Sequence, residues 1–95
     1  MALYPHSMQS AVTSVSASAS NVTLLEEDPQ RKGFFLFNDS SNNCYVKFGT
    51  TASTTSFTIK MAAGSFYEIE YPNYRGQIDA IWDGTNGAMR VTEIK

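Results

Sequence analysis

Residues 33–48 read GFFLFNDSSNNCYVKF, and this stretch decides the fold class. Residues 34–37 are apolar on both faces of a strand, which predicts a strand in the middle of a sheet that is covered on both sides. Residues 38–43 form a polar turn cluster, because Asn and Asp side chains bond their own backbone and tolerate left-handed conformations. Residues 44–48 then alternate between the two faces of a strand. The stretch predicts extended chain, a turn, and extended chain again.

The same alternation recurs on both sides of this stretch, with a turn about every ten residues. No segment carries the i, i+3, i+4, i+7 apolar pattern of a stable helix. The connections are too short for parallel crossovers, so neighbouring strands are expected to be antiparallel. We therefore predict an all-β antiparallel β-sandwich of seven or eight strands, with a jelly roll as one form of it. The further expected strands lie at residues 22–25, 57–61, 67–71, 77–82 and 89–94.

The chain has 95 residues, which is enough for one domain. We place the sandwich at residues 21–95 and treat residues 1–20 as an N-terminal arm or edge strand. Residues 10–20 read SAVTSVSASAS and alternate small apolar with small polar side chains. This pattern fits an arm that pairs along a neighbouring subunit, with Val15 as its candidate contact residue. It also fits a plain first edge strand or a disordered leader.

The composition favours contacts with other protein surfaces. Charged residues make up only 17% of the chain, against a usual quarter, while 42% are hydrophobic. A surface so poor in charge predicts cover by other subunits, and we expect a homo-oligomer, most simply a trimer. The formal net charge is -2 and the cations are scattered, so no nucleic-acid partner is expected. No apolar run reaches the ~18 residues of a membrane span, and no membrane partner is expected either.

The reactive residue types are too few for common catalytic constellations. His6 is the single histidine and Cys44 the single cysteine, so neither a disulfide framework nor a Cys-based zinc site is available. Cys44 lies in an alternating strand, where a small core residue is the simpler interpretation than a reactive thiol. No glycine-rich nucleotide motif is present. We expect no enzyme activity, no catalytic residue, no cofactor and no metal site.

Four carboxylates are candidates for acid–base chemistry. Glu68 and Glu70 share one strand face, and Asp79 and Asp83 flank Trp82. An exposed polar face explains all four, and such faces are far commoner than active sites. Residues 83–87, DGTNG, place oxygen ligands at alternate positions, yet they predict a hairpin turn rather than a calcium loop.

The aromatic residues, 13% of the chain, carry more information. Tyr67, Tyr71, Tyr74 and Trp82 gather late in the sequence, near turns. Such rings can form a sugar-stacking platform or the centre of a protein interface. Alternation with Ile78 instead indicates that Trp82 fills the core. For Tyr71 and Tyr74, which flank a Pro-Asn turn, we expect contact with a partner.

Several short segments of the chain form a recognisable series. They are RKG (31–33), FNDSS (37–41), YVKFG (45–49), AS (52–53), TIKMAAG (58–64), YE (67–68), GQIDAIW (76–82) and RVTE (90–93). Together these segments resemble a family of small tailed-bacteriophage proteins encoded among virion structural genes, over roughly residues 11–95. The resemblance implies a virion component, such as a capsid decoration (cement) protein, a head-fibre base or a tail accessory, and it supplies no catalytic residues.

These expectations combine into one functional hypothesis. The protein is expected to be made in the host cytoplasm, since residues 1–6 lack the features of a secretion signal, and to end up in the virion. Its expected partner is the major capsid protein or another virion component. The alternative is a sugar-binding adhesin module of a tail or head fibre, and an interaction module of a cellular complex comes third.

Overall fold

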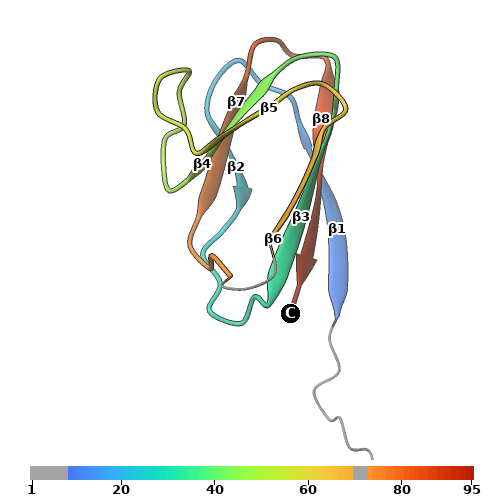
Figure 1. Ribbon diagram of the computed structural model, residues 1–95, viewed down its shortest axis with the longest axis vertical. Coiled ribbons are helices and arrows are strands. Elements are labelled where there is room, and N and C mark those ends of the chain that lie inside the picture. The colour runs from blue at the N-terminus through green and yellow to red at the C-terminus, as the bar shows by residue number, and fades with distance from the viewer. Residues whose placement is uncertain (1–8, 70–72) are drawn as a thin grey trace, which may run out of the picture.

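The computed structural model describes residues 9–69 and 73–95, and every regular element in them is a strand (Figure 1). This confirms the predicted all-β fold. The eight strands are β1 (Ser10–Ser16), β2 (Val22–Leu25), β3 (Gly33–Ser40), β4 (Cys44–Phe48), β5 (Ile59–Met61), β6 (Phe66–Ile69), β7 (Ile78–Trp82) and β8 (Gly87–Ile94).

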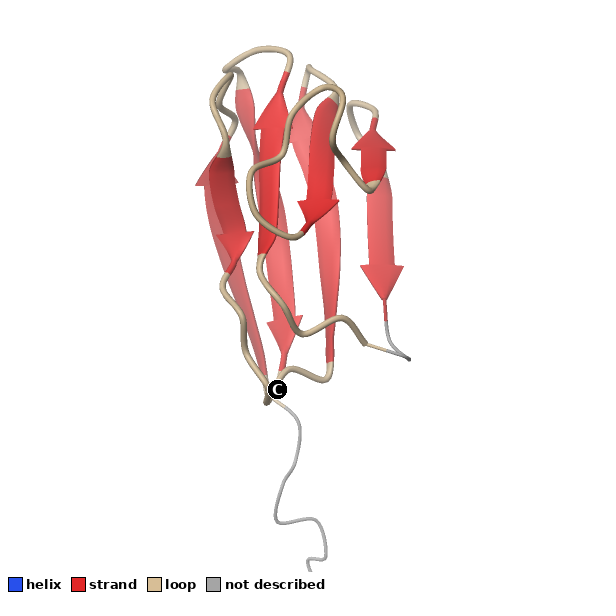
Figure 2. Ribbon diagram, turned by 90° about the vertical axis from the view of Figure 1, so that its left-hand side faces the viewer, coloured by secondary structure: helices blue, strands red, loops and turns tan. Residues whose placement is uncertain are grey.

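The strands form two four-stranded antiparallel sheets that pack face to face. Sheet A has the order β1-β8-β3-β6 and sheet B the order β2-β7-β4-β5. Figure 2 looks onto sheet B, with sheet A behind it. Strands β1 and β8, β2 and β7, β3 and β6, and β4 and β5 are paired. This nested pairing is what results when one long antiparallel ribbon is rolled up, and it makes the sandwich a jelly roll.

The core lies between the two sheets and is built by the alternation that the sequence shows. In β3 the side chains of Phe34 and Leu36 are fully buried, and in β7 Ile78, Ala80 and Trp82 point inward. Both sheets contribute aliphatic or aromatic side chains to a single cluster. Its remaining fully or nearly fully buried members include Leu24, Leu25, Cys44, Val46, Met61, Met89 and Val91.

Residues 10–16, for which an arm or an edge strand was expected, form the edge strand β1 of sheet A. All seven residues pair with β8 in one unbroken register, from Ser10 opposite Ile94 to Ser16 opposite Ala88. Gln9 extends the pairing by exchanging two backbone hydrogen bonds with Lys95. Residues 1–8 lie outside the described residues, as do residues 70–72.

The structure corrects two details of the predicted strands. Residues 34–37 do lie in an inner strand, but the described residues bury only one of its faces, because Phe37 on the opposite face is 38% exposed. The expected strand at residues 57–61 is shorter, since pairing with β4 begins at Ile59. Phe57 instead packs edge-on against Tyr45, with 5.2 Å between the ring centroids.

Candidate functional site

The outward side of sheet A carries a row of large apolar side chains. The register places Phe37 of β3 directly opposite Phe66 of β6. Phe35 precedes Phe37 by two residues in β3 and therefore lies on the same side of the sheet. Val12 of β1 belongs to the same side, because its partner Thr92 in β8 also faces Phe35. We call Val12, Phe35, Phe37 and Phe66 the aromatic face.

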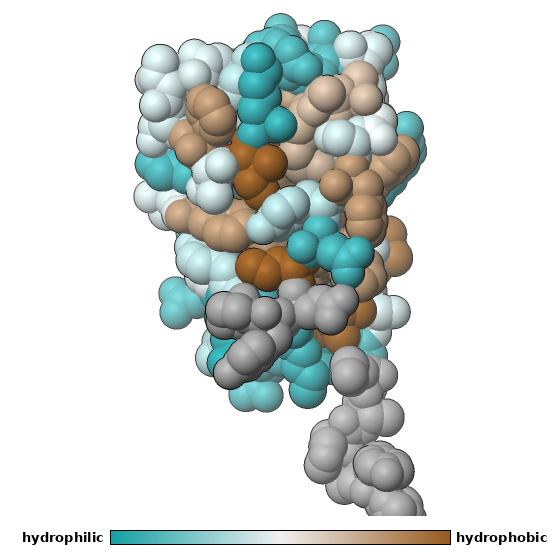
Figure 3. Space-filling view, in the orientation of Figure 1, coloured by the Kyte–Doolittle hydropathy of each residue, from teal (hydrophilic) through white to brown (hydrophobic). Residues whose placement is uncertain are grey.

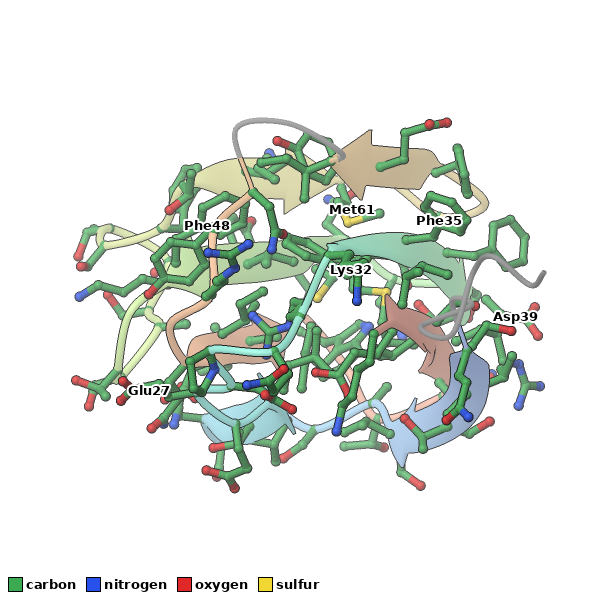
Figure 4. The ribbon with its side chains drawn as sticks, turned by 90° about the horizontal axis from the view of Figure 1, so that it is seen from below. Glu27, Lys32, Phe35, Asp39, Phe48 and Met61 are labelled. Carbon is green, nitrogen blue, oxygen red and sulfur yellow. The ribbon has the colours of Figure 1, made fainter. Side chains whose placement is uncertain are left out.

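The aromatic face is open to solvent. Val12 is 66% exposed and Phe66 57%, and the rings of Phe35 and Phe66 lie 6.0 Å apart. Figure 4 shows Phe35 on the outer side of β3, whereas Met61 lies between the sheets. Figure 3 shows the molecule from the edge of the sandwich, with hydrophobic surface visible on the right-hand side, where sheet A lies. Isolated exposed hydrophobic residues are ordinary, but the rings of Phe35, Phe37 and Phe66 are neighbours on β3 and β6, and such a group marks a contact surface.

Polar side chains of β8 lie between Val12 and the three rings of the aromatic face, because Thr92 and Arg90 separate β1 from β3 on this side. Arg90 forms an ion pair with Asp39, at 2.9 Å between Nη2 and Oδ2, and both side chains are about half exposed. Arg90 Nη1 also donates a hydrogen bond to Ser14 Oγ of β1, at 2.7 Å. The guanidinium thereby joins β1, β8 and β3 on their outer side. Exposed apolar rings beside polar groups are the usual arrangement of a protein interface.

Two of the tyrosines predicted from the sequence meet inside one end of the sandwich. Tyr74 stacks on Phe48, with ring centroids 4.8 Å apart and planes inclined by 16°, and its hydroxyl donates to the carbonyl oxygen of Gln77 at 2.9 Å. The Tyr67 ring lies 6.2 Å from that of Phe48 and 6.5 Å from that of Phe34. Both tyrosines are half-buried, so this cluster closes the end of the core.

The other predicted contact residues are not part of this cluster. Trp82 is only 2% exposed and donates from Nε1 to Oδ1 of Asn38 at 3.2 Å. Val15 is half-buried on the inner side of β1, where it packs against the core. Tyr71 lies outside the described residues. The five residues therefore do not form one exposed surface in the part of the chain that is described.

The sequence analysis assigned Asp79 to an exposed polar face, and the structure corrects this. Asp79 is buried, with only 2% of its surface exposed. The loop after β4 covers it, and its carboxylate accepts hydrogen bonds from the backbone N–H of Thr51 at 2.7 Å and from the side chains of Asn21, Thr23 and Gln77. Burial raises the pKa of Asp79, but the four hydrogen bonds outweigh it and hold the pKa below its usual value. All its donors are neutral, so the carboxylate is a structural anchor for the loop.

The reactive side chains of the described residues form no metal-binding group, and the single cysteine is buried. Burial raises the pKa of the Cys44 thiol to about 12, so the thiol stays protonated and unreactive at neutral pH. Residues 9–69 and 73–95 hold no group of three or more His, Cys, Asp or Glu side chains placed to bind a metal ion. Nor do they contain a helix of the length and apolarity that a membrane span needs.

An open crevice of ≈ 330 Å³ lies between β1 and the end of β2. Its floor is apolar, from Leu24 and Leu25, and its rim is mostly acidic. The one lysine on that rim, Lys95, is paired with Asp28 at 2.8 Å between Nζ and Oδ2. This ion pair and the backbone N–H of Gln30 hold the pKa of Asp28 below its usual value. The crevice shows no ordered set of groups aimed at a ligand.

Sequence reasoning missed the aromatic face as a site, although its signal is visible in the sequence. Both the even-numbered and the odd-numbered residues of 34–37 are apolar, so apolar side chains lie on both sides of this strand. Phe66 next to Tyr67 likewise places one ring on each side of β6. Only the register shows that the surplus rings of two strands meet on the same side. Comparisons with protein-family models, curated proteins and solved structures found no match.

Proposed function

We propose that this protein is a bacteriophage virion structural protein, a capsid decoration protein that binds a protein shell through the aromatic face. The observation that carries the proposal is the exposure of Phe37 and Phe66, which lie directly opposite each other on the outer side of sheet A. Aromatic side chains are enriched at the centre of protein interfaces, where their burial supplies most of the binding energy. A shell offers a surface large enough to cover such a face.

The fold and the filled interior both support a binding role. Jelly rolls recur in viral capsid and lectin domains, although a fold alone does not fix a function. The interior is filled with hydrophobic side chains and with polar groups that bond one another. What remains for function is the outer surface.

The adhesin alternative receives less support. A sugar-stacking platform needs rings with an open face. Trp82 is buried, and one face of Tyr74 is covered by Phe48. Among the described residues, the aromatic rings that are most exposed are Phe37, Phe57 and Phe66, and these lack the polar group with which Tyr or Trp usually assists sugar binding.

The first test asks whether the protein is in the particle. Peptides of this chain should be found by mass spectrometry in gradient-purified phage particles from a culture that expresses its gene. They should be depleted from the fractions that hold free protein. Particles that lack the peptides, from a culture in which the free protein is abundant, would contradict the virion proposal.

The second test asks whether the aromatic face makes the contact. The double variant Phe37→Thr/Phe66→Thr should keep its circular dichroism spectrum, because Thr suits a strand and neither ring is buried. Its co-sedimentation with particles that lack the protein should weaken by at least about tenfold, since interface aromatics contribute roughly 2 kcal/mol each. Phe57→Thr is the matched control, as Phe57 is 40% exposed on the other sheet. Equal binding of both variants would exclude the aromatic face as the contact.

A further inference from the structure

Strand β1 leaves one of its two backbone edges unpaired by the described residues. Gln9 and Lys95 exchange both of their backbone hydrogen bonds, and Ala17 N–H donates to Gly87. In an antiparallel pair such residues alternate, so the odd-numbered residues of β1 direct their backbone groups toward β8. The N–H and C=O groups of the even-numbered residues point away from β8, and no described residue bonds them. These residues are Ser10, Val12, Ser14 and Ser16.

This free edge lacks the usual devices that prevent strand addition. Native edge strands are short, charged, bulged or interrupted by proline. Strand β1 is seven residues long, reads SAVTSVS and pairs with β8 without a register shift. The other edge strands differ, because β5 has three residues, β6 has four and includes Glu68, and β2 has an irregularity between Thr23 and Leu25. Among the edge strands in the described part of the chain, β1 therefore offers another strand the longest regular edge.

We propose that a second copy of this chain pairs with β1 through its own β1, antiparallel about a two-fold axis at Thr13. In this register Val12 lies opposite Ser14 of the second copy, and Ser10 lies opposite Ser16. All the outward-directed backbone groups of both strands are then used, because each of these pairs is a hydrogen-bonded pair. The inference rests on the edge itself and does not depend on the virion proposal.

The sequence of β1 is suited to a copy of itself. Read about Thr13, it is nearly palindromic: serine meets serine at the ends, and Ala11 meets Val15 on the inner side. The central pair is Thr13 with Thr13, a favourable cross-strand combination. The strand carries no charge, so no like charges oppose each other. A two-fold contact requires that kind of self-complementarity.

The pairing would join the two copies of sheet A into one continuous sheet. The row that runs from Phe66 through Phe37 and Arg90 to Ser14 would continue into Val12 of the second copy. Both aromatic faces would then lie on one side of a single, wider surface. A closed two-fold pair differs from the trimer that the composition suggests, and the mass in solution distinguishes the two.

Cysteine cross-linking tests the register. Thr13→Cys places its thiol next to that of the second copy, since the Cα atoms of a non-hydrogen-bonded pair are about 4.5 Å apart, a separation that a disulfide can span. Ala11→Cys is the matched control. In this register Ala11 lies opposite Val15 of the second copy, so the two Ala11 positions are four residues, or about 13 Å, apart along the strands. The native Cys44 is fully buried and does not interfere. Mild oxidation should convert Thr13→Cys, but not Ala11→Cys, into a covalent dimer.

A proline variant tests the edge independently. Val12→Pro removes an N–H from the free edge but none that bonds to β8, a position at which edge strands tolerate proline. Light scattering on the full-length protein should give twice the 10.5 kDa chain mass for the wild type and the single mass for Val12→Pro, with unchanged circular dichroism. Val12→Thr should remain dimeric. A wild-type monomer or trimer would overturn the proposal, as would equal cross-linking of the two cysteine variants.

Discussion

At the scale of single residues, buried polar groups hold separate segments of this protein together by hydrogen bonds. Asp79 shows this most clearly, since its carboxylate joins the start of β2, the loop after β4 and the turn before β7. The loop residue Thr51 has φ of 63°, a conformation that costs a β-branched residue energy. The hydrogen bond from its N–H to Asp79 helps to offset that cost. Asn21 supports the same loop by accepting from the N–H of Ala52 at 2.8 Å.

We predict that Asp79→Asn destabilises the protein at pH 7 by roughly 1–3 kcal/mol, because the amide turns an NH₂ group toward donors that need an acceptor. The folded pKa of Asp79 is lower than the unfolded value of about 3.9, so the folded state binds fewer protons. Its stabilising contribution is therefore present above about pH 4 and is lost as the pH falls through the folded pKa. Urea unfolding from pH 7 to pH 2 should show the two proteins converging in acid. A difference that stays constant over this range would contradict the prediction.

Residue roles were predictable where alternation decides them. Trp82 alternates with Ile78 and Ala80 in the sequence, and all three are buried. The same alternation assigns Asp79 to the outer side of β7, which is correct for the strand. The error lay in treating that side as exposed, because a loop nearly thirty residues earlier in the chain covers it. Cover by a distant loop leaves no periodic signal in the sequence.

At the scale of elements, Arg31 fastens the connections at one end of the sandwich. Its side chain is fully buried, and Nε donates to Glu93 of β8 at 3.0 Å. The two Nη groups donate to the carbonyl oxygens of Glu26, Tyr74 and Gly76. The guanidinium also lies 5.8 Å from the ring centre of Phe34. One residue thereby joins the β2–β3 connection, the segment before β7, and β8.

We predict that Arg31→Met costs about 3–5 kcal/mol, since it leaves Glu93 and three carbonyl groups without their donor. Arg31→Lys should recover only part of the loss, because one ammonium group cannot reach all of these acceptors. The matched control is Arg90→Met, which removes an ion pair between half-exposed side chains and should cost less than about 1 kcal/mol. Urea midpoints of the three variants test this. Equal losses at Arg31 and Arg90 would refute the assignment.

The elements show where sequence reasoning succeeds and where it stops. Residues 22–25 were predicted to be a strand with the bounds that the structure gives, and the predicted strand at 77–82 starts only one residue early, because turn residues flank both segments. The order of the strands in the sheets, by contrast, depends on pairings such as Ser10 with Ile94, far apart in the chain. The aromatic face depends on the same pairings, so no local pattern could have located it.

At the scale of the whole molecule, two thin sheets share one core and are also joined by hydrogen bonds through it. Asn38 of β3 is fully buried, and its Nδ2 donates to the carbonyl oxygen of Met61 in β5 at 3.0 Å. Its Oδ1 accepts from Trp82 of β7. The Asn38 amide thus bonds sheet A to two strands of sheet B. We infer that neither sheet is stable without the other, because a four-stranded sheet with an uncovered apolar face has no separate core.

We therefore predict that the domain unfolds as a single cooperative unit and that Trp82→Ala disrupts both sheets. Removing this ring should cost about 3–5 kcal/mol, a large part of the 5–15 kcal/mol by which small domains are stable. Native-state hydrogen exchange should show the amides of β3 and β7 losing protection by the same factor, although they belong to different sheets. Phe66→Ala is the control, since Phe66 is more than half exposed, and it should leave that protection nearly unchanged. If β7 exchanged freely in Trp82→Ala while β3 stayed protected, the sheets would be separate units, and the outer side of sheet A could bind a partner without the rest of the fold.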